Sequence, residues 1–192
     1  MTERVLAGLP GPRWRWIAAW AALPLVRLAL HFAGAPIGTP EMWSSYVFAG
    51  VVPAVVYSLA VAYSLWITPR LVRQAVELEP VLERLGASGV KVAPGATSTR
   101  GPLTLTAVFC LLTGIPGVIN HGLPAAVAVP VVFAVDLALF NALWVYLTVV
   151  VGLDHIGRGR LELDPFPEDR SLGLRPVGAL AVSSLRAFLI VI

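Results

Sequence analysis

A single carboxylate stands inside the most apolar stretch of the chain. Asp136 is the only charged residue between positions 124 and 152, and a charge at the centre of a membrane helix costs about 2.5–3.5 kcal/mol, so it needs a partner or a wet cavity. Arg27 and Arg186 lie in two other apolar runs. At 1.5 Å of rise per residue, Asp136 lies about 12 Å, Arg186 about 14 Å and Arg27 about 17 Å from the inner membrane surface. Either guanidinium could reach Asp136, and the depth of Arg186 matches better.

Two chemistries are open to Asp136. An ion pair with arginine would lock a helical bundle, whereas an intramembrane carboxylate can also mark the path of a proton or cation. On a helical wheel, Asn141 lies beside Ala138, on nearly the opposite face of the helix from Asp136. Small residues there permit close approach of another helix, and an amide can hydrogen-bond across the contact. A helix covered on both faces belongs in the middle of a bundle. The candidate intramembrane polar site consists of Asp136, Arg186, Arg27 and Asn141.

The chain lacks the motifs of the common catalytic and cofactor sites. It contains no H-E-x-x-H, no G-x-S-x-G, no P-loop and no dinucleotide-binding fingerprint. His155 lies near several acidic residues, but their spacing matches no metal-ligand pattern. The sequence therefore favours a protein that is not an enzyme, and it indicates no metal and no cofactor.

The composition is that of a membrane protein. Of the 192 residues, 57% are hydrophobic and 13% charged, and the mean hydropathy is +0.81, whereas soluble domains carry about 25% charged residues. The net charge of +3 is spread over short segments between apolar runs, which is not the pattern of a nucleic-acid groove. The fold class we expect is all-α, a polytopic transmembrane helical bundle.

The apolar runs divide the chain into four complete spans and part of a fifth. A rival interpretation of the first run is a signal peptide cleaved after Ala35, but Arg27 would then lie inside its apolar core. Gly114 and Pro116 indicate an unwound or kinked outer end of span three, and a tight turn at 120–122 predicts an antiparallel hairpin with span four. We expect one membrane domain over 1–192, an N-terminal fragment of a longer protein, with spans at about 16–33, 43–67, 103–119, 124–152 and 177–192.

The Lys and Arg residues mark one side of the membrane. Two of the 14 lie inside spans; the others precede the first span or lie in the loops 68–102 and 153–176, and none lies in the opposite connections. The positive-inside rule places such segments in the cytoplasm. We therefore expect a cytoplasmic N-terminus and two cytoplasmic loops.

The first of these loops begins with an amphipathic segment. Its apolar residues recur every three or four positions, and Pro80 lies among them. One interpretation is a helix lying on the membrane surface or on its own bundle; the other is a short coiled-coil seam for self-association, which Pro80 and the two-heptad length weaken. A flexible connector over 86–102 is expected to follow. The apolar stripe consists of Leu71, Ala75, Leu78, Leu82 and Leu85.

One segment of the second loop resembles a known group of proteins. The sequence LELDPFPEDRSLGLRPVGALA resembles a cytoplasmic loop of uncharacterised prokaryotic multi-spanning membrane proteins with a P-x-x-D-R-x-x-G-L motif, here with one residue fewer between Pro and Asp. The resemblance covers about 20 residues. It implies a location in the prokaryotic cytoplasmic (inner) membrane and further spans beyond Ile192, and it implies no activity. The matching residues are Pro167, Asp169, Arg170, Gly173 and Leu174.

Two classes of function remain. The intramembrane charges and the broken third span favour a transporter- or channel-like component. The alternative is a membrane-embedded structural or signalling module whose cytoplasmic amphipathic helix binds a partner. The expected partners are the lipid bilayer and either a second copy of the chain or another membrane subunit, with no nucleic acid.

Overall fold

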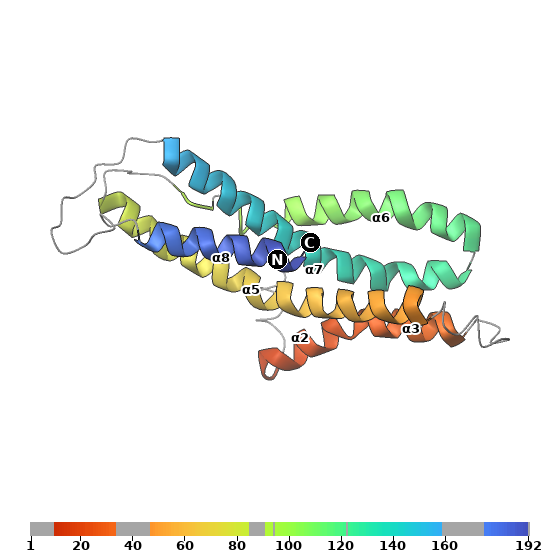
Figure 1. Cartoon of the computed structure of the whole chain (residues 1–192). Helices are drawn as coiled ribbons and strands as arrows, with labels where there is room; N and C mark the ends of the chain where they lie inside the picture. The colour runs from red at the N-terminus through yellow and green to blue at the C-terminus, as the bar shows by residue number, and fades with distance from the viewer. Residues whose placement is uncertain are drawn as a thin grey trace.

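The chain is a bundle of helices arranged around two long central ones (Figure 1). The structure, a computed structural model, describes residues 10–33, 47–84, 91–93, 95–121, 123–158 and 175–191. These residues contain helices and turns and no strand, which confirms the all-α fold class. In chain order the elements are α2 (Arg13–Ala21), α3 (Leu23–Ala33), a π-helical turn η1 (Val47–Val51), α5 (Val52–Arg84), α6 (Arg100–His121), α7 (Leu123–Arg158) and α8 (Arg175–Val191).

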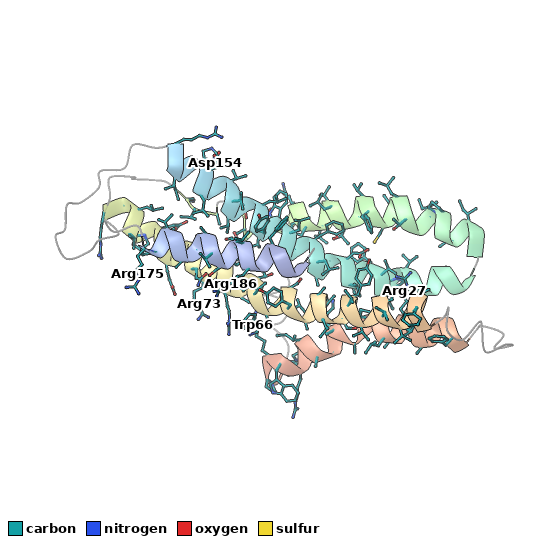
Figure 2. All side chains as sticks on the ribbon, in the orientation of Figure 1. Arg27, Trp66, Arg73, Asp154, Arg175 and Arg186 are labelled. Carbon is teal, nitrogen blue, oxygen red and sulfur yellow. The ribbon has the colours of Figure 1, made fainter. Side chains whose placement is uncertain are left out.

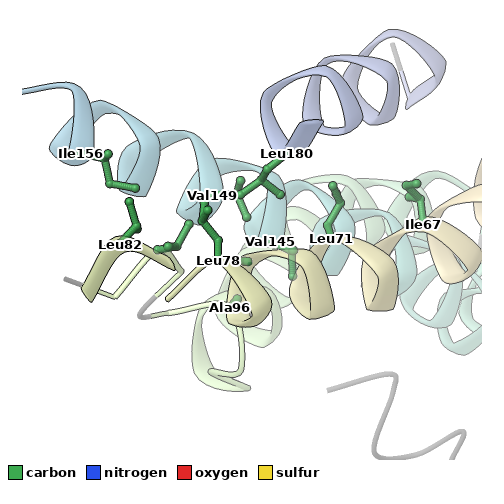
Figure 3. Close-up of a cluster of buried hydrophobic side chains, with 11 residues drawn as sticks. Ile67, Leu71, Leu78, Leu82, Ala96, Val145, Val149, Ile156 and Leu180 are labelled. Atoms are coloured by element: carbon green, nitrogen blue, oxygen red, sulfur yellow. The ribbon is translucent and has the colours of Figure 1, made fainter. Parts of the chain in front are cut away.

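The two central helices, α5 and α7, run parallel and pack along their lengths. Two clusters of buried apolar side chains join them. The first joins Val61 and Leu65 of α5 to Val135 and Ala138 of α7. The second, farther along both helices, is drawn in Figure 3 and takes in Leu180 of α8. Its α5 and α7 members are Ile67, Leu71, Ala75, Leu78, Leu82, Val145, Val149 and Ile156.

Different elements cover the two halves of this central pair. We call the half covered by α2, α3 and α6 the α6 half, and the half covered by α8 and by residues 91–93 and 95–99 the α8 half (Figure 1). In the α6 half, the indole nitrogen of Trp20 donates a hydrogen bond to the carbonyl oxygen of Ala134 over 2.8 Å. In the α8 half, the rings of Tyr146 and Phe188 stack with their centroids 5.0 Å apart.

Helix α5 is longer than the sequence predicted. The expected span ended near residue 67, yet the helix continues to Arg84 through Pro69 and Pro80. The prolines remove two backbone hydrogen bonds, but the segment buries the stripe from Leu71 to Leu82 against α7, and tertiary packing supplies most of the stability of a helix in a protein. The last residue of the stripe, Leu85, lies outside the described residues. The expected start of a loop at residue 68 is therefore wrong. Of the two interpretations of the stripe, packing on its own bundle is the one observed.

The first expected span is broken. Helix α2 ends at Ala21 and α3 begins at Leu23, with a turn at Ala22. Pro24 explains the break, because its nitrogen cannot donate to the carbonyl of Trp20. The amides of Leu25 and Val26 instead both donate to the carbonyl of Ala22, each over 3.0 Å.

The third and fourth expected spans form the predicted hairpin. Helix α6 ends at His121, α7 begins at Leu123, and the two pack against each other. Of the two forms expected for the outer end of this span, unwound or kinked, the unwound one is wrong, because α6 runs as a continuous helix through Pro116 to His121. Pro116 leaves one backbone carbonyl of the preceding turn without its amide partner, a loss that one turn within a packed hairpin tolerates.

Part of the expected flexible connector is packed. The Trp144 indole nitrogen donates a hydrogen bond to the Gly95 carbonyl oxygen over 2.8 Å, and Val92 is fully buried against α7. Gly152 permits this approach, because a Cβ atom there would overlap the backbone carbonyl of Val92. For residues 91–93 and 95–99, the prediction of a flexible connector is therefore wrong. We call these residues the clamped segment.

Two of the described helical stretches are long and apolar enough to cross a membrane, judged by length and composition. They are Phe48–Arg84 and Ala128–Arg158, while the apolar helix Arg100–Pro116 is shorter. The first expected span falls on two short helices separated at Ala22, α2 with 9 residues and α3 with 11, and α8 has 17 residues. This is fewer than the four complete spans expected from apolar runs. The two long helices indicate association with a membrane.

Candidate functional site

A cavity of about 350 Å³ lies where the covering of the central pair passes from α6 to α8. Its walls are almost entirely apolar and aromatic, and α5, α6, α7 and α8 all contribute to them. On α7 it extends from Asp136 to Tyr146, a distance of about 15 Å at the helical rise. The side chains that line it are Tyr57, Ile67, Leu71, Phe109, Asp136, Leu139, Phe140, Ala142, Leu143, Tyr146 and Phe188.

Asp136 is the charged group of this cavity. It is half-buried on the side of α7 that faces α6. The thiol of Cys110 on α6 lies 3.8 Å from its Oδ2 atom and is placed to donate to it. A thiol is a weak donor, so this contact satisfies only a small part of the hydrogen-bonding capacity of a carboxylate.

The two arginines of the candidate site lie in opposite halves of the bundle (Figure 2). Arg27 has an exposed side chain on α3, which packs against α7 in the α6 half, the half that also holds Asp136. Arg186 lies on α8, two residues before Phe188, which stacks on Tyr146. Tyr146 follows Asp136 by ten residues, so Arg186 lies about 15 Å or more from Asp136 along the bundle. The structure therefore brings Asp136 toward Arg27 and leaves Arg186, an exposed side chain, apart from it.

Asn141 lies on the other side of α7 from Asp136, as the wheel predicted. It is buried together with Ala138 and Ala142, and Ala138 packs against Val61 and Leu65 of α5. Ala138 therefore lies where the two central helices meet, whereas Ala142 of the same small-residue face lines the cavity together with Asp136. Asn141 is buried and does not line the cavity.

Most residues of this site were missed from the sequence. The rings of Phe109 and Phe140 meet edge to face with their centroids 5.4 Å apart, and Cys110 of α6 contacts the carboxylate of Asp136. Phe140 and Leu143, which the helical wheel places on the same side of the helix as Asp136, do line the cavity with it. The contribution of α6 to the site had no signal in the sequence, because it depends on which face of α6 is turned toward α7 in the hairpin.

The described lining of the cavity holds one carboxylate, two tyrosines and otherwise apolar side chains. Within the described ranges, no three His, Cys, Asp or Glu side chains gather closely enough to hold a metal ion. An apolar cavity with aromatic walls and one placed charge has the usual make-up of a small-molecule site.

Comparisons with protein-family models, with curated proteins and with solved structures gave no match. The motif residues of the resembling loop, Pro167 to Leu174, lie outside the described residues.

Proposed function

We propose that the chain is a multi-pass integral membrane protein that acts as a transporter- or channel-like component, with Asp136 at its polar site. The apolar side chains that face outward support the membrane setting. Leu59 is 66% exposed on α5, and Leu112 and Ile119 are 70% and 76% exposed on α6. Apolar surface on this scale would be a liability in water and is the expected covering of helices in lipid.

The lengths of the shorter helices support further spans beside α5 and α7. Together, α2 and α3 reach about 31 Å along the bundle and the 22 residues of α6 reach about 33 Å, against a hydrocarbon thickness of about 30 Å. We propose four spans formed by α2–α3, α5, α6 and α7. Helix α8 packs on the other half of the central pair, at a different level along the bundle from the layer that α6 covers. The lipid bilayer is then the main partner.

The proposed topology places the N-terminus and both long loops in the cytoplasm of a prokaryotic cell. Single cysteines in a Cys110→Ser background, probed with a membrane-impermeant thiol reagent on intact cells, test it. We expect labelling from outside at the two outer positions and none at the two inner ones. Labelling of either inner position from outside would refute the topology. The outer positions are Thr39 and His121, and the inner ones are Lys91 and Arg160.

One observation carries the transport proposal. The half-buried carboxylate of Asp136 lies in the middle of the long apolar helix α7 and lines a cavity between the helices. Intramembrane carboxylates are costly and mark ion or solute pathways. Purified protein in liposomes should pass protons or potassium ions, read with a pH-sensitive or potassium-sensitive dye. Asp136→Asn should lower the rate about tenfold or more, and Asp136→Glu should keep a substantial part of it. Equal rates for wild type, Asp136→Asn and empty liposomes would refute the proposal.

The burial of the amphipathic stripe weighs against the signalling alternative. Leu71, Leu78 and Leu82 are each 1% exposed or less, and they pack against α7 and α8. A partner would have to displace these helices before it could bind the stripe. For this reason the transport proposal is preferred.

A further inference from the structure

We propose that the cavity beside Asp136 binds a lipophilic organic monocation, with the cationic centre at the carboxylate and the apolar body along the aromatic walls toward Tyr146. The inference rests on the proposed function, because it takes the same site in the membrane and names its ligand class.

The charge of the site selects a cation. Among the described residues, Asp136 is the only acidic or basic one that lines the cavity, and its hydrogen-bond contact to the Cys110 thiol is long at 3.8 Å. A carboxylate in an apolar environment with so weak a contact lacks most of the solvation it had in water. A cation that reaches it supplies the missing interaction, and an anion of the same size is repelled.

The walls select an organic cation over a metal ion. Calcium takes six to eight oxygen ligands, and magnesium takes six with near-ideal geometry. The lining offers one carboxylate and two tyrosine hydroxyls among otherwise apolar side chains. A cation whose charge is shielded by carbon groups needs no such oxygen shell, and it gains from burying apolar surface.

The aromatic residues near Asp136 add a second attraction for a cation. Phe140 lies one helical turn from Asp136, and Phe109 meets it edge to face at 5.4 Å. Aromatic faces attract cations within about 6 Å of the ring centroid, and quaternary ammonium groups are typical ligands of such sites. The volume of about 350 Å³ lies in the range of small drug-sized ligands.

Arg27 gives the inference a directional test. Arg27 lies on α3, which packs against α7 in the same half of the bundle as Asp136, although Arg27 does not line the cavity. It should therefore oppose a bound cation without touching it. Removing the charge should tighten cation binding by about two- to fivefold, a modest factor because the exposed guanidinium is screened by solvent.

The experiment compares two ions of nearly the same size and shape and opposite charge, tetraphenylphosphonium and tetraphenylborate. Equilibrium binding of each to the full chain in lipid nanodiscs is measured, with empty nanodiscs subtracted for partitioning into lipid. We expect saturable binding of tetraphenylphosphonium at one per chain and none of tetraphenylborate. Asp136→Asn should weaken the binding at least tenfold, Asp136→Glu less than fivefold, and Arg27→Gln should strengthen it.

Size-exclusion profiles of the three variants identify any that misfold, and Asp136→Glu provides the charged control at the same position. Saturable binding of tetraphenylphosphonium that is unchanged in a folded Asp136→Asn variant would overturn the inference, and so would equal binding of both ions. The flux assay separates the two proposals. Ion flux that depends on Asp136 without saturable phosphonium binding leaves the transport proposal and removes this one; binding without flux does the reverse.

Discussion

Replacing Gly152 with alanine should loosen the clamped segment from α7. The new methyl group would occupy the position of the Val92 backbone carbonyl, so either the segment or the helix must move. Overpacking of this kind costs about 1–3 kcal/mol, and displacement of the segment also threatens the Trp144–Gly95 hydrogen bond, worth about 1 kcal/mol. The better helix propensity of alanine offsets about 1 kcal/mol. The net expectation is a loss of about 2 kcal/mol in the free energy of unfolding.

Thermal unfolding in detergent micelles measures this loss, and about 2 kcal/mol corresponds to a midpoint about 4–8 °C lower. Gly157→Ala is the matched control, since it lies in the same helix and no described atom lies within 4 Å of the place that a Cβ atom would take there. It should leave the midpoint unchanged or raise it by the gain in helix propensity. If Gly152→Ala raised the midpoint as much as Gly157→Ala, the close packing of Val92 on α7 would be refuted.

Two further changes test the contacts of the site and of the clamped segment. Asp136→Asn combined with Arg27→Gln should show a coupling of about 0.5–1 kcal/mol in thermal unfolding, whereas Asp136→Asn with Arg186→Gln should be additive; a larger coupling to Arg186 would contradict the register set by α8. Trp144→Phe keeps the packing of the ring but removes the indole donor to Gly95. It should lower the midpoint by about 2–4 °C, and an unchanged midpoint would mean that this hydrogen bond contributes little.

The helices that could be predicted are those whose apolar runs coincide with their packing. The run 124–152 became α7 (Leu123–Arg158), and the tight turn before it correctly predicted the hairpin. The end of α5 was missed because Pro69 and the charges after it resemble a helix stop in sequence. Only the presence of α7 alongside shows that the stripe from Leu71 to Leu82 is buried. Helix ends of this kind depend on tertiary contacts and not on local propensity.

Part of the site could be predicted from the sequence. Asp136 stood out because a charge in an apolar run is costly, and the wheel separated it correctly from Asn141. Its neighbours depend on the register between helices. The depth count assumed that every span starts at the same level, whereas the Tyr146–Phe188 stack sets α8 at a level where Arg186 cannot reach Asp136. Counting residues within each span cannot give this difference in level between α7 and α8.

Pro69 lies inside α5 between Ile67 and Leu71, both of which line the cavity. Because proline lacks an amide hydrogen, the carbonyl of Leu65 has no partner at position 69, and Thr68 turns its hydroxyl to the carbonyl of Ser64 over 2.6 Å. Helices bend most readily where such a backbone bond is missing. The bending stiffness of α5 is therefore reduced beside the cavity, so a small tilt of its C-terminal end about Pro69 would change the width of that wall before it disturbed the packing of α2 or α3 on the N-terminal part of α5.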